Sequence, residues 1–219
     1  MNFKISKVFF IVAVIVLGAC SKKQTTVPSP DVPTINGVAY PTVKIGSQRW
    51  TTINYNGPGG VNYERSEANS AVYGKFYTRN EAVAISLPPG WRIPTFTDWN
   101  KLISTLGGTP LENNIRNSNL PATVVKSLMS NADWSDNGTN SSSFNAYPAG
   151  VYGDKDSPAV PQFTEKGSMA DFISSSVYFN GETVNFFIRT EFDHTLTSGF
   201  GGYLISDKAA ASIRFVKDE

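Results

Sequence analysis

The stretch Pro88-Pro89-Gly90-Trp91-Arg92-Ile93-Pro94-Thr95 and the segment after it decide the fold of this chain. Thr95 precedes Asp98 by three residues, a spacing that resembles the capping box at the start of a helix. Apolar residues then recur at positions i, i+3, i+4 and i+7, which places one apolar stripe on a helix. They are Trp99, Leu102, Ile103 and Leu106. Gly107-Gly108 ends the helix, because glycine accepts the left-handed conformation of a C-terminal cap.

A β-hairpin is predicted near the start of the folded domain, which we expect to begin near Ile35. Gly46-Ser47 separates two β-type runs, residues 38–45 and residues 48–54. A Gly-X pair in this position is suited to a two-residue type II′ turn.

Between the hairpin and the proline-bounded stretch, the pattern changes twice. Residues 56–70 are rich in Gly, Asn and charged residues and predict a loop, and residues 73–77 predict a short strand. Thr78 then lies three residues before Glu81, which is a capping box. A short helix over residues 82–85 is therefore expected.

The second half of the chain changes from helical to β-type patterns. Pro121 opens a predicted third helix that runs to Met129, since proline suits the first helical turn. After Ser130, short β-type runs alternate with clusters of Gly, Asn, Asp and Ser, and Asn180-Gly181 predicts a hairpin turn. The runs are residues 144–147, 172–175, 176–179, 184–191, 202–206 and 212–216. Strands, then helices, then strands predict a segregated α+β fold with short, mostly antiparallel strands, two to three flanking helices and long loops.

The N-terminus carries a processing signal. Two lysines precede an apolar run from Val8 to Leu17, which is about half the length of a membrane-spanning helix, so residues 1–19 are predicted to be a signal peptide. The run leads into Leu17-Gly18-Ala19-Cys20, which resembles a bacterial lipobox and implies that Cys20 becomes the lipidated first residue. A plain secretory signal that happens to hold a cysteine, or a buried free thiol, is the alternative.

The segment after the signal peptide is predicted to be a tether. Residues 20–34 contain three prolines and no apolar periodicity, so they should be extended, and residues 35–219 should form the folded domain. Residues 1–19 hold two of the 19 basic residues, which leaves 17 basic against 18 acidic residues and a formal net charge of −1. A near-neutral chain lacks the basic surface that nucleic acid requires. The expected partner is a membrane, bound through lipid, and the expected location is the outer membrane, on an undetermined face.

Several pieces of the chain together carry a family resemblance: residues 42–50, 73–78, 89–95, 98–99 with Leu102, 137–140, 143–144, 148–150 and 213–218. In this order and spacing they resemble the major paralogous domain of Fibrobacter succinogenes, a family frequent in bacterial lipoproteins of the Bacteroidetes–Fibrobacter group. The resemblance runs from about Ile35 to Lys217. It implies a C-type-lectin-like fold with paired terminal strands, flanking helices and a long irregular region that carries any ligand site.

The resemblance also implies a lost crosslink. The family usually has one cysteine just before the Pro-x-Gly-Trp element and another in the final strand, and here Leu87 and Phe215 stand in those places. Because both replacements are apolar, we expect the two side chains to be in contact in the core.

Catalysis is not expected. Cys20 is the only cysteine and is assigned to lipid, so the active-site cysteines of the formylglycine-generating enzymes that share the implied fold are missing. His194 is the only histidine, and a catalytic triad requires a histidine in a defined geometry with its partners. His194 is interpreted as a polar loop residue. No cofactor is expected. Loop oxygens at Asp136, Asn137, Asp154 and Asp156 leave a calcium site open as an alternative, although calcium needs six to eight converging oxygens.

The candidate ligand-binding residues lie in the loops after Ser130. Trp134 in a Ser/Asn/Asp-rich loop is interpreted either as an exposed ring that stacks on a sugar or as a side chain that fills the core under the loop. The other three tryptophans, in regular or proline-anchored elements, are expected in the core. The remaining candidates are Asp136, Asn137, Asn140, Tyr147 and Tyr152. The hypothesis is a non-catalytic, lipid-anchored envelope protein that binds a glycan or a protein; the alternative is a structural or assembly component that binds partner proteins without a small-ligand site.

Overall fold

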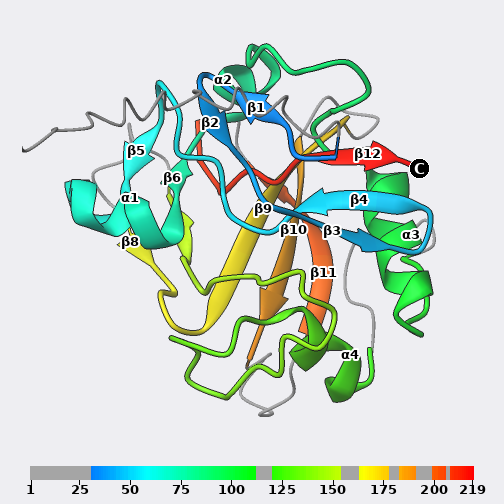
Figure 1. Ribbon diagram of the computed structural model, residues 1–219. Helices are drawn as coiled ribbons and strands as arrows, with labels where there is room; N and C mark the ends of the chain where they lie inside the picture. Colours follow the sequence, from blue (N-terminus) through cyan, green and yellow to red (C-terminus); the bar gives the residue numbers. More distant parts are fainter. Residues whose placement is uncertain (1–30, 112–119, 154–162, 178–182, 191–198, 206–207) are drawn as a thin grey trace, which may run out of the picture.

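The computed structural model describes residues 31–111, 120–153, 163–177, 183–190, 199–205 and 208–219, with the backbone alone for 183 and 199–205. All strands of this part of the chain pair antiparallel, and three of its helices have seven or more residues. In Figure 1, strands β9 (Met169–Val177) and β10 (Thr183–Arg189) run through the middle. Helices α3 (Phe96–Thr105) and α4 (Ala122–Leu128) lie to one side and α1 (Glu67–Tyr73) to the other. The predicted α+β class is confirmed.

One sheet joins the beginning of the domain to its end. Strands β3 (Thr42–Ile45) and β4 (Gln48–Thr51) form a hairpin, and β12 (Val216–Asp218) pairs with the other edge of β4. At the turn, Gly46 has a φ of +61° and Ser47 does not share the positive φ, as a type II′ turn requires. The predicted hairpin is confirmed, with shorter strands than expected.

The central sheet has the order β11-β10-β9, with β11 spanning Gly199–Ile205. Strand β9 is continuous where two separate strands had been predicted from residues 172–175 and 176–179. Its serines interrupt the apolar pattern, but their polar groups have partners: the Ser175 amide donates to the Pro94 carbonyl at 2.8 Å, and the Ser176 hydroxyl accepts from the Phe96 amide at 2.9 Å. The Asn180-Gly181 turn lies outside the described residues.

Three two-stranded ladders complete the β-structure. They are β1 (Thr34–Ile35) with β2 (Val38–Ala39), β5 (Val61–Asn62) with β6 (Lys75–Phe76), and β7 (Val151–Tyr152) with β8 (Phe163–Thr164). The predicted strand over residues 144–147 is wrong. Ala146 forms only an isolated bridge with Met129, because the backbone of this buried segment bonds to the end of α4: the Ala146 amide donates to Leu128 at 2.8 Å, and its carbonyl accepts from Ser130 at 2.8 Å.

Both predicted capping boxes are present. The Glu81 carboxylate accepts from the Thr78 amide at 2.8 Å at the start of α2 (Arg79–Val83), and Asp98 does the same for Thr95 at 2.9 Å at the start of α3. The third predicted helix is α4. These helices are visible in the sequence because their start signals are local.

Helix α1 and the preceding 3-10 turn η1 (Tyr63–Arg65) were missed, because residues 56–70 were predicted to be a loop. The reason is physical. None of the α1 residues is buried, so the segment has no apolar stripe, and the stripe is the main signal of a helix in a sequence.

The apolar stripe of α3 forms the centre of the main core. Trp99, Leu102 and Ile103 have no exposed surface, and the Trp99 ring lies 4.9 Å from Trp50 and 5.2 Å from Phe186 between ring centroids. Trp91 is 6% exposed. The expectation that the three tryptophans outside the Ser/Asn/Asp-rich loop are buried is confirmed.

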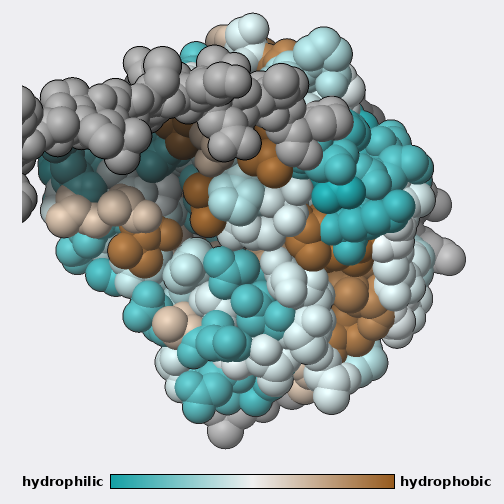
Figure 2. Space-filling view, viewed as in Figure 1, coloured by the Kyte–Doolittle hydropathy of each residue, from teal (hydrophilic) through white to brown (hydrophobic). Residues whose placement is uncertain are grey.

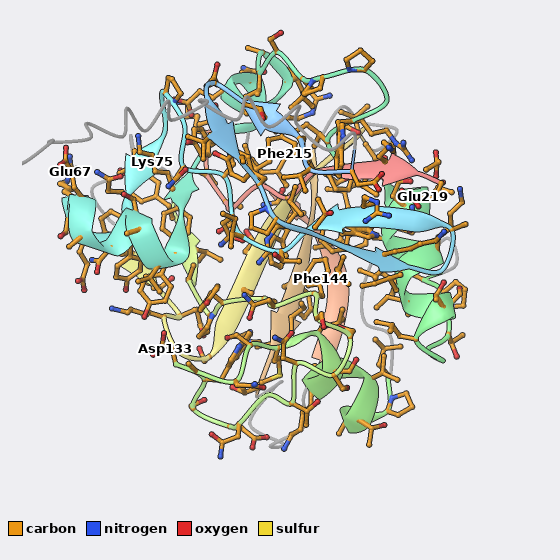
Figure 3. All side chains as sticks on the ribbon, in the orientation of Figure 1. Glu67, Lys75, Asp133, Phe144, Phe215 and Glu219 are labelled. Carbon is orange, nitrogen blue, oxygen red and sulfur yellow. The ribbon has the colours of Figure 1, made fainter. Side chains whose placement is uncertain are left out.

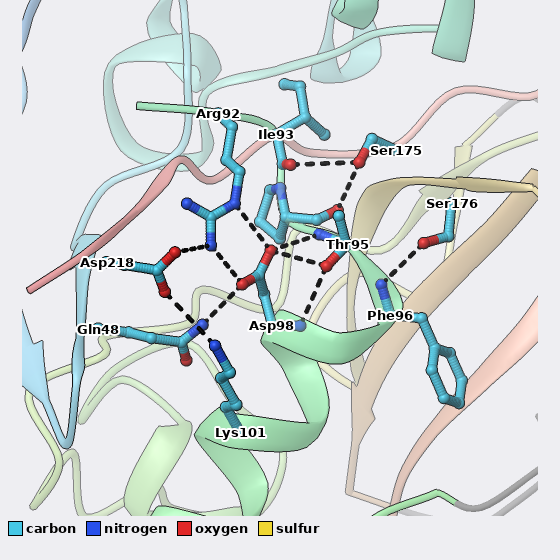
Figure 4. A network of polar contacts seen from close by, with 11 residues as sticks. Gln48, Arg92, Ile93, Thr95, Phe96, Asp98, Lys101, Ser175, Ser176 and Asp218 are labelled. Carbon is cyan, nitrogen blue, oxygen red and sulfur yellow. Dashed lines mark hydrogen bonds and ion pairs between the residues drawn. The ribbon is translucent and has the colours of Figure 1, made fainter. Parts of the chain in front are cut away.

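The proline-bounded stretch links α3 to the sheet of β3, β4 and β12 and to strand β9 of the central sheet (Figure 4). Arg92 exchanges two backbone hydrogen bonds with Val216 of β12, at 2.9 and 3.0 Å. Its guanidinium donates to both oxygens of Asp98, at 2.6 and 3.1 Å, and also pairs with Asp218. Asp98 therefore caps α3 and at the same time ties it to the last strand.

The two positions of the lost crosslink lie in one apolar cluster. Phe215 is fully buried, and the half-buried Leu87 packs against the cluster that contains it. The expectation that these residues meet in the core is supported at the level of a shared cluster.

Arg214, next to Phe215, is buried without a carboxylate partner among the described residues. Its guanidinium donates to the Asn54 side chain at 2.6 Å and to the backbone carbonyls of Thr51, Phe144 and Asn145 at 2.7–2.9 Å. Burial lowers the pKa of Arg214 to about 9, so the group stays protonated at neutral pH. The final segment thereby fixes the loop after α4 onto the terminal sheet.

Candidate functional site

Trp134 lies beneath the loop that carries it. Its side chain is 7% exposed, belongs to the main core cluster and donates from the indole N–H to the Ala146 carbonyl at 2.9 Å. Stacking on a sugar requires an accessible ring face, so the interpretation of Trp134 as an exposed stacking residue is corrected. The alternative interpretation, in which Trp134 fills the core under the loop, agrees with the observed position. A buried tryptophan is stabilised when its ring N–H has a hydrogen-bond partner.

Three candidates lie at the surface of the same loop region. Asp136 is exposed and forms an ion pair with Lys126 at 2.9 Å, and Asn137 is exposed. Asn140 has a φ of +47°, and its side chain exchanges hydrogen bonds with Asn145 at 2.9 and 3.2 Å. Asn140 therefore shapes the loop, and a ligand-binding role for all three stays a prediction. In Figure 2, hydrophilic side chains cover much of the lower part of this face, where Figure 1 places the loops that follow α4.

The two tyrosine candidates have different environments. Tyr152 is 3% exposed and lies between Phe163 and Phe76, at ring centroid distances of 4.8 and 6.4 Å. It is a core residue, so the structure does not place it at the surface as the ligand-binding prediction expected. Tyr147 is half-buried and meets the half-buried Tyr73 edge to face, at 6.3 Å and an interplanar angle of 87°.

Tyr147 leads to a set of side chains that the sequence did not reveal. Tyr63, Tyr73 and Tyr147 form what we call the tyrosine cluster, in which the Tyr63 and Tyr73 centroids are 6.3 Å apart. The ammonium of Lys166 lies 4.9 Å from the Tyr63 ring centroid and 5.1 Å from that of Tyr73. The Tyr73 hydroxyl donates to the Asp133 carboxylate at 3.2 Å. Figure 3 shows Asp133 on the side of the molecule where α1 begins at Glu67.

Two segments position the Tyr63 and Tyr73 rings and the lysine beside them. Tyr63 opens η1 and Tyr73 closes α1, so the η1–α1 unit supplies both rings. Lys166 stands on a turn whose next residue, Gly167, is fixed by two backbone hydrogen bonds: Gly167 donates to Pro148 at 2.9 Å, and Ser135 donates to Gly167 at 2.7 Å.

The turn of Lys166 is also held by its neighbour Glu165. The Glu165 carboxylate accepts from Arg189 of β10 at 2.6 Å and from Ser168 at 2.7 Å. Burial raises the pKa of Glu165, but these two hydrogen bonds outweigh burial and the pKa is lowered. The turn is therefore anchored on the central sheet, and Lys166 extends from a fixed base.

A carboxylate acts on each of the Tyr63 and Tyr73 hydroxyl groups. The pKa of Tyr73 is raised, first by burial and then by the charge and hydrogen bond of Asp133. The pKa of Tyr63 is raised by burial and by the adjacent Glu64. Both tyrosines stay protonated at neutral pH. The tyrosine cluster offers ring faces and hydroxyl groups, and the residues beside it add the carboxylates of Glu64 and Asp133 and the ammonium of Lys166. This combination is suited to stacking and hydrogen bonding with a polar ligand.

Other chemistry has less support in the described part of the chain. Its His, Cys, Asp and Glu side chains form no group of three that could hold a metal ion. Asp154, Asp156 and His194 lie outside the described residues. None of the described helices is long and apolar enough to cross a membrane.

Comparison with known proteins assigns the chain to a family. The model of the Fibrobacter succinogenes major domain matches residues 43–217. The chain therefore belongs to this family, which agrees with the resemblance of its sequence motifs. No curated protein and no solved structure matches the chain.

Proposed function

We propose that this chain is a lipid-anchored protein of the cell envelope, held at the outer membrane through Cys20, with a non-catalytic domain that binds a glycan or a protein. We further propose that the domain is C-type-lectin-like, with its ligand surface on the loops and on the η1–α1 unit. The family assignment, the paired terminal strands and the loop-rich second half support this proposal.

The tyrosine cluster is the observation that carries the proposal. Aromatic side chains at a surface supply large contact area at a low cost in conformational entropy, and tyrosine adds a hydroxyl for hydrogen bonding. Here Tyr73 and Tyr147 are half-buried rather than part of the closed core, and the exposed Asp133 and Lys166 adjoin them. Such a surface can stack on a ring and bond its substituents at the same time.

A glycan array and an envelope pull-down test the proposal. The full chain, solubilised in a detergent without sugar groups, is compared with Tyr73→Ser and with Glu67→Ser, a matched control on the exposed face of the same helix. We expect a retained glycan or protein that Tyr73→Ser loses and Glu67→Ser keeps. If both variants keep the ligand, the tyrosine cluster is not the site. Envelope proteins captured equally by all three forms, with no glycan bound, would favour the structural or assembly alternative.

The membrane anchor is tested separately. Metabolic labelling with a radioactive fatty acid should mark the chain and should not mark Cys20→Ser. A labelled Cys20→Ser chain would contradict lipidation at this residue, whatever the result of the binding experiments.

A further inference from the structure

The rings of Tyr63 and Tyr73 form an open angle that holds a cation. Their planes meet at 53°, and the Lys166 ammonium lies within about 5 Å of both centroids. A cation within roughly 6 Å of an aromatic centroid is attracted by the negative face of the ring. Two rings turned toward one ammonium resemble, in arrangement, the aromatic walls by which proteins recognise organic cations.

The charges beside the rings have the sign that favours a cation. Asp133 accepts the Tyr73 hydroxyl at 3.2 Å, and Glu64 directly follows Tyr63. Both carboxylates belong to exposed residues, and Glu64 and Asp133 have positive φ values of 50° and 70°. A carboxylate beside an aromatic wall adds Coulomb attraction to the attraction of the ring.

Lys166 is a weakly held occupant. It is exposed, and it forms no ion pair with any residue of the described ranges. Its contact with the rings is therefore a cation–π contact at a solvent-exposed site, which is modest in strength. Because the lysine side chain is long and flexible, it can swing into solvent without repacking the core. With Lys166 in place, Tyr63 is 5% exposed and Tyr73 is half-buried, and the ring faces that the lysine covers would then become accessible.

We propose that Tyr63 and Tyr73 form a binding site for an alkylammonium group and that Lys166 is its built-in competitor. This inference rests on the proposed function, because it names the chemistry of the ligand at the same surface. An ammonium of this kind occurs in quaternary amines, in amino sugars and in lysine side chains of proteins. The shared chemistry is the positive charge over two rings.

Choline and its neutral isostere 3,3-dimethylbutan-1-ol test the role of charge. Calorimetric titration of the full chain should show binding of choline and no binding of the isostere, since only the ammonium is attracted by the rings. Equal binding of both would overturn the proposal in favour of a plain apolar site. If choline binds neither the native chain nor Lys166→Met, the proposal is overturned as well.

Variants test the competitor. Lys166→Met should bind choline about two- to five-fold more tightly, which corresponds to the modest strength of an exposed cation–π contact. Lys217→Met is the matched control, because Lys217 also lies over an aromatic ring, that of Trp91 at 5.9 Å. Its affinity should equal that of the native chain. An unchanged affinity in Lys166→Met would contradict the competitor role.

A conservative pair separates ring chemistry from folding. Tyr73→Phe keeps the ring and should bind choline within about two-fold of the native chain, whereas Tyr73→Leu should bind at least about five-fold more weakly. Loss of binding in Tyr73→Phe would overturn the assignment to the ring face.

The source of the ammonium follows from a last comparison. Glucosamine, N-acetylglucosamine and Nα-acetyl-lysine amide are titrated in turn. Preference for glucosamine over its N-acetyl form assigns an amino sugar, and preference for the lysine derivative assigns a protein side chain. A ligand found on the glycan array, together with no binding of any ammonium probe, would overturn this inference and leave the proposed function standing.

Discussion

The guanidinium of Arg214 donates to the backbone carbonyl of Phe144 at 2.9 Å and lies 5.1 Å from the centroid of the Phe144 ring. The two residues are 70 positions apart. One buried cation therefore fixes the loop after α4 to the last segment of the chain, and Figure 3 shows Phe144 near the centre of the molecule. This relationship makes Arg214 the residue on which the shape of the loop region most depends.

Replacement of Arg214 should therefore destabilise the whole domain. Arg214→Met removes four hydrogen bonds and leaves three carbonyls and the Asn54 side chain without their donor, so the free energy of unfolding should fall by at least about 3 kcal/mol. Urea denaturation followed by tryptophan fluorescence measures this loss. Arg214→Lys should recover part of it, because lysine keeps the charge but not the planar fork. A loss below about 1 kcal/mol in Arg214→Met would show that the loop is held by other contacts.

The domain should lose stability in acid through Asp98. Burial raises the pKa of Asp98, but the hydrogen bonds from Arg92 and Thr95 outweigh it, so the pKa is lowered in the folded state. A carboxyl with a lowered pKa contributes stability above its unfolded pKa of about 4 and loses it as pH falls through the folded value. The free energy of unfolding should therefore decrease below about pH 4. Asp98→Asn should be less stable at pH 7 and show a shallower acid decline; an identical slope in both forms would exclude Asp98 as the source.

The buried tyrosines Tyr40 and Tyr77 should ionise only at a higher pH than free tyrosine. Burial raises the pKa of Tyr40 to about 12 and also raises that of Tyr77. Since the unfolded pKa is about 10, the stability that these protonated groups provide is complete below pH 10 and is lost as pH rises through the folded value. Absorbance at 295 nm should show delayed titration, and Tyr40→Phe should remove one delayed group. Complete titration of all tyrosines near pH 10, with the fold intact, would contradict this expectation.

Leu87 and Phe215 should be energetically coupled. Phe215→Ala is expected to cost about 3–5 kcal/mol and Leu87→Ala less, because Leu87 is only half-buried. If the side chains are in contact, the double variant should lose less than the sum of the single losses, with a coupling energy of at least about 0.5 kcal/mol. A double-mutant cycle in urea measures this term. Strict additivity would mean that the two residues share a cluster without touching.

Trp134 should behave as a core residue in solution. Trp134→Phe loses the hydrogen bond to Ala146 and part of the buried ring, so the free energy of unfolding should fall by about 1–3 kcal/mol. Any ligand affinity of the tyrosine cluster should stay unchanged. Reduced affinity with unchanged stability would restore the interpretation of Trp134 as a ligand-binding residue.

The local signals of the sequence predicted much of the fold. The capping boxes at Thr78 and Thr95, the hairpin at Gly46-Ser47 and the apolar stripe of α3 all depend on residues within one or two turns of each other. A single sequence contains that information directly. Helix α1 was missed because its residues remain at the surface and show no periodicity.

The candidate site depended on tertiary contacts instead. Tyr63 lies 103 positions before Lys166 and Tyr73 lies 74 positions before Tyr147, and no local pattern indicates that these residues meet. Trp134 and Tyr152 were named as ligand candidates from their polar neighbours, yet the structure buries both. The sequence by itself determined helices α2, α3 and α4, the hairpin turn at Gly46-Ser47 and the family. Only the tertiary structure decided which aromatic rings fill the core and which reach the surface, because burial is set by the elements that pack around a side chain and not by its neighbours in the chain.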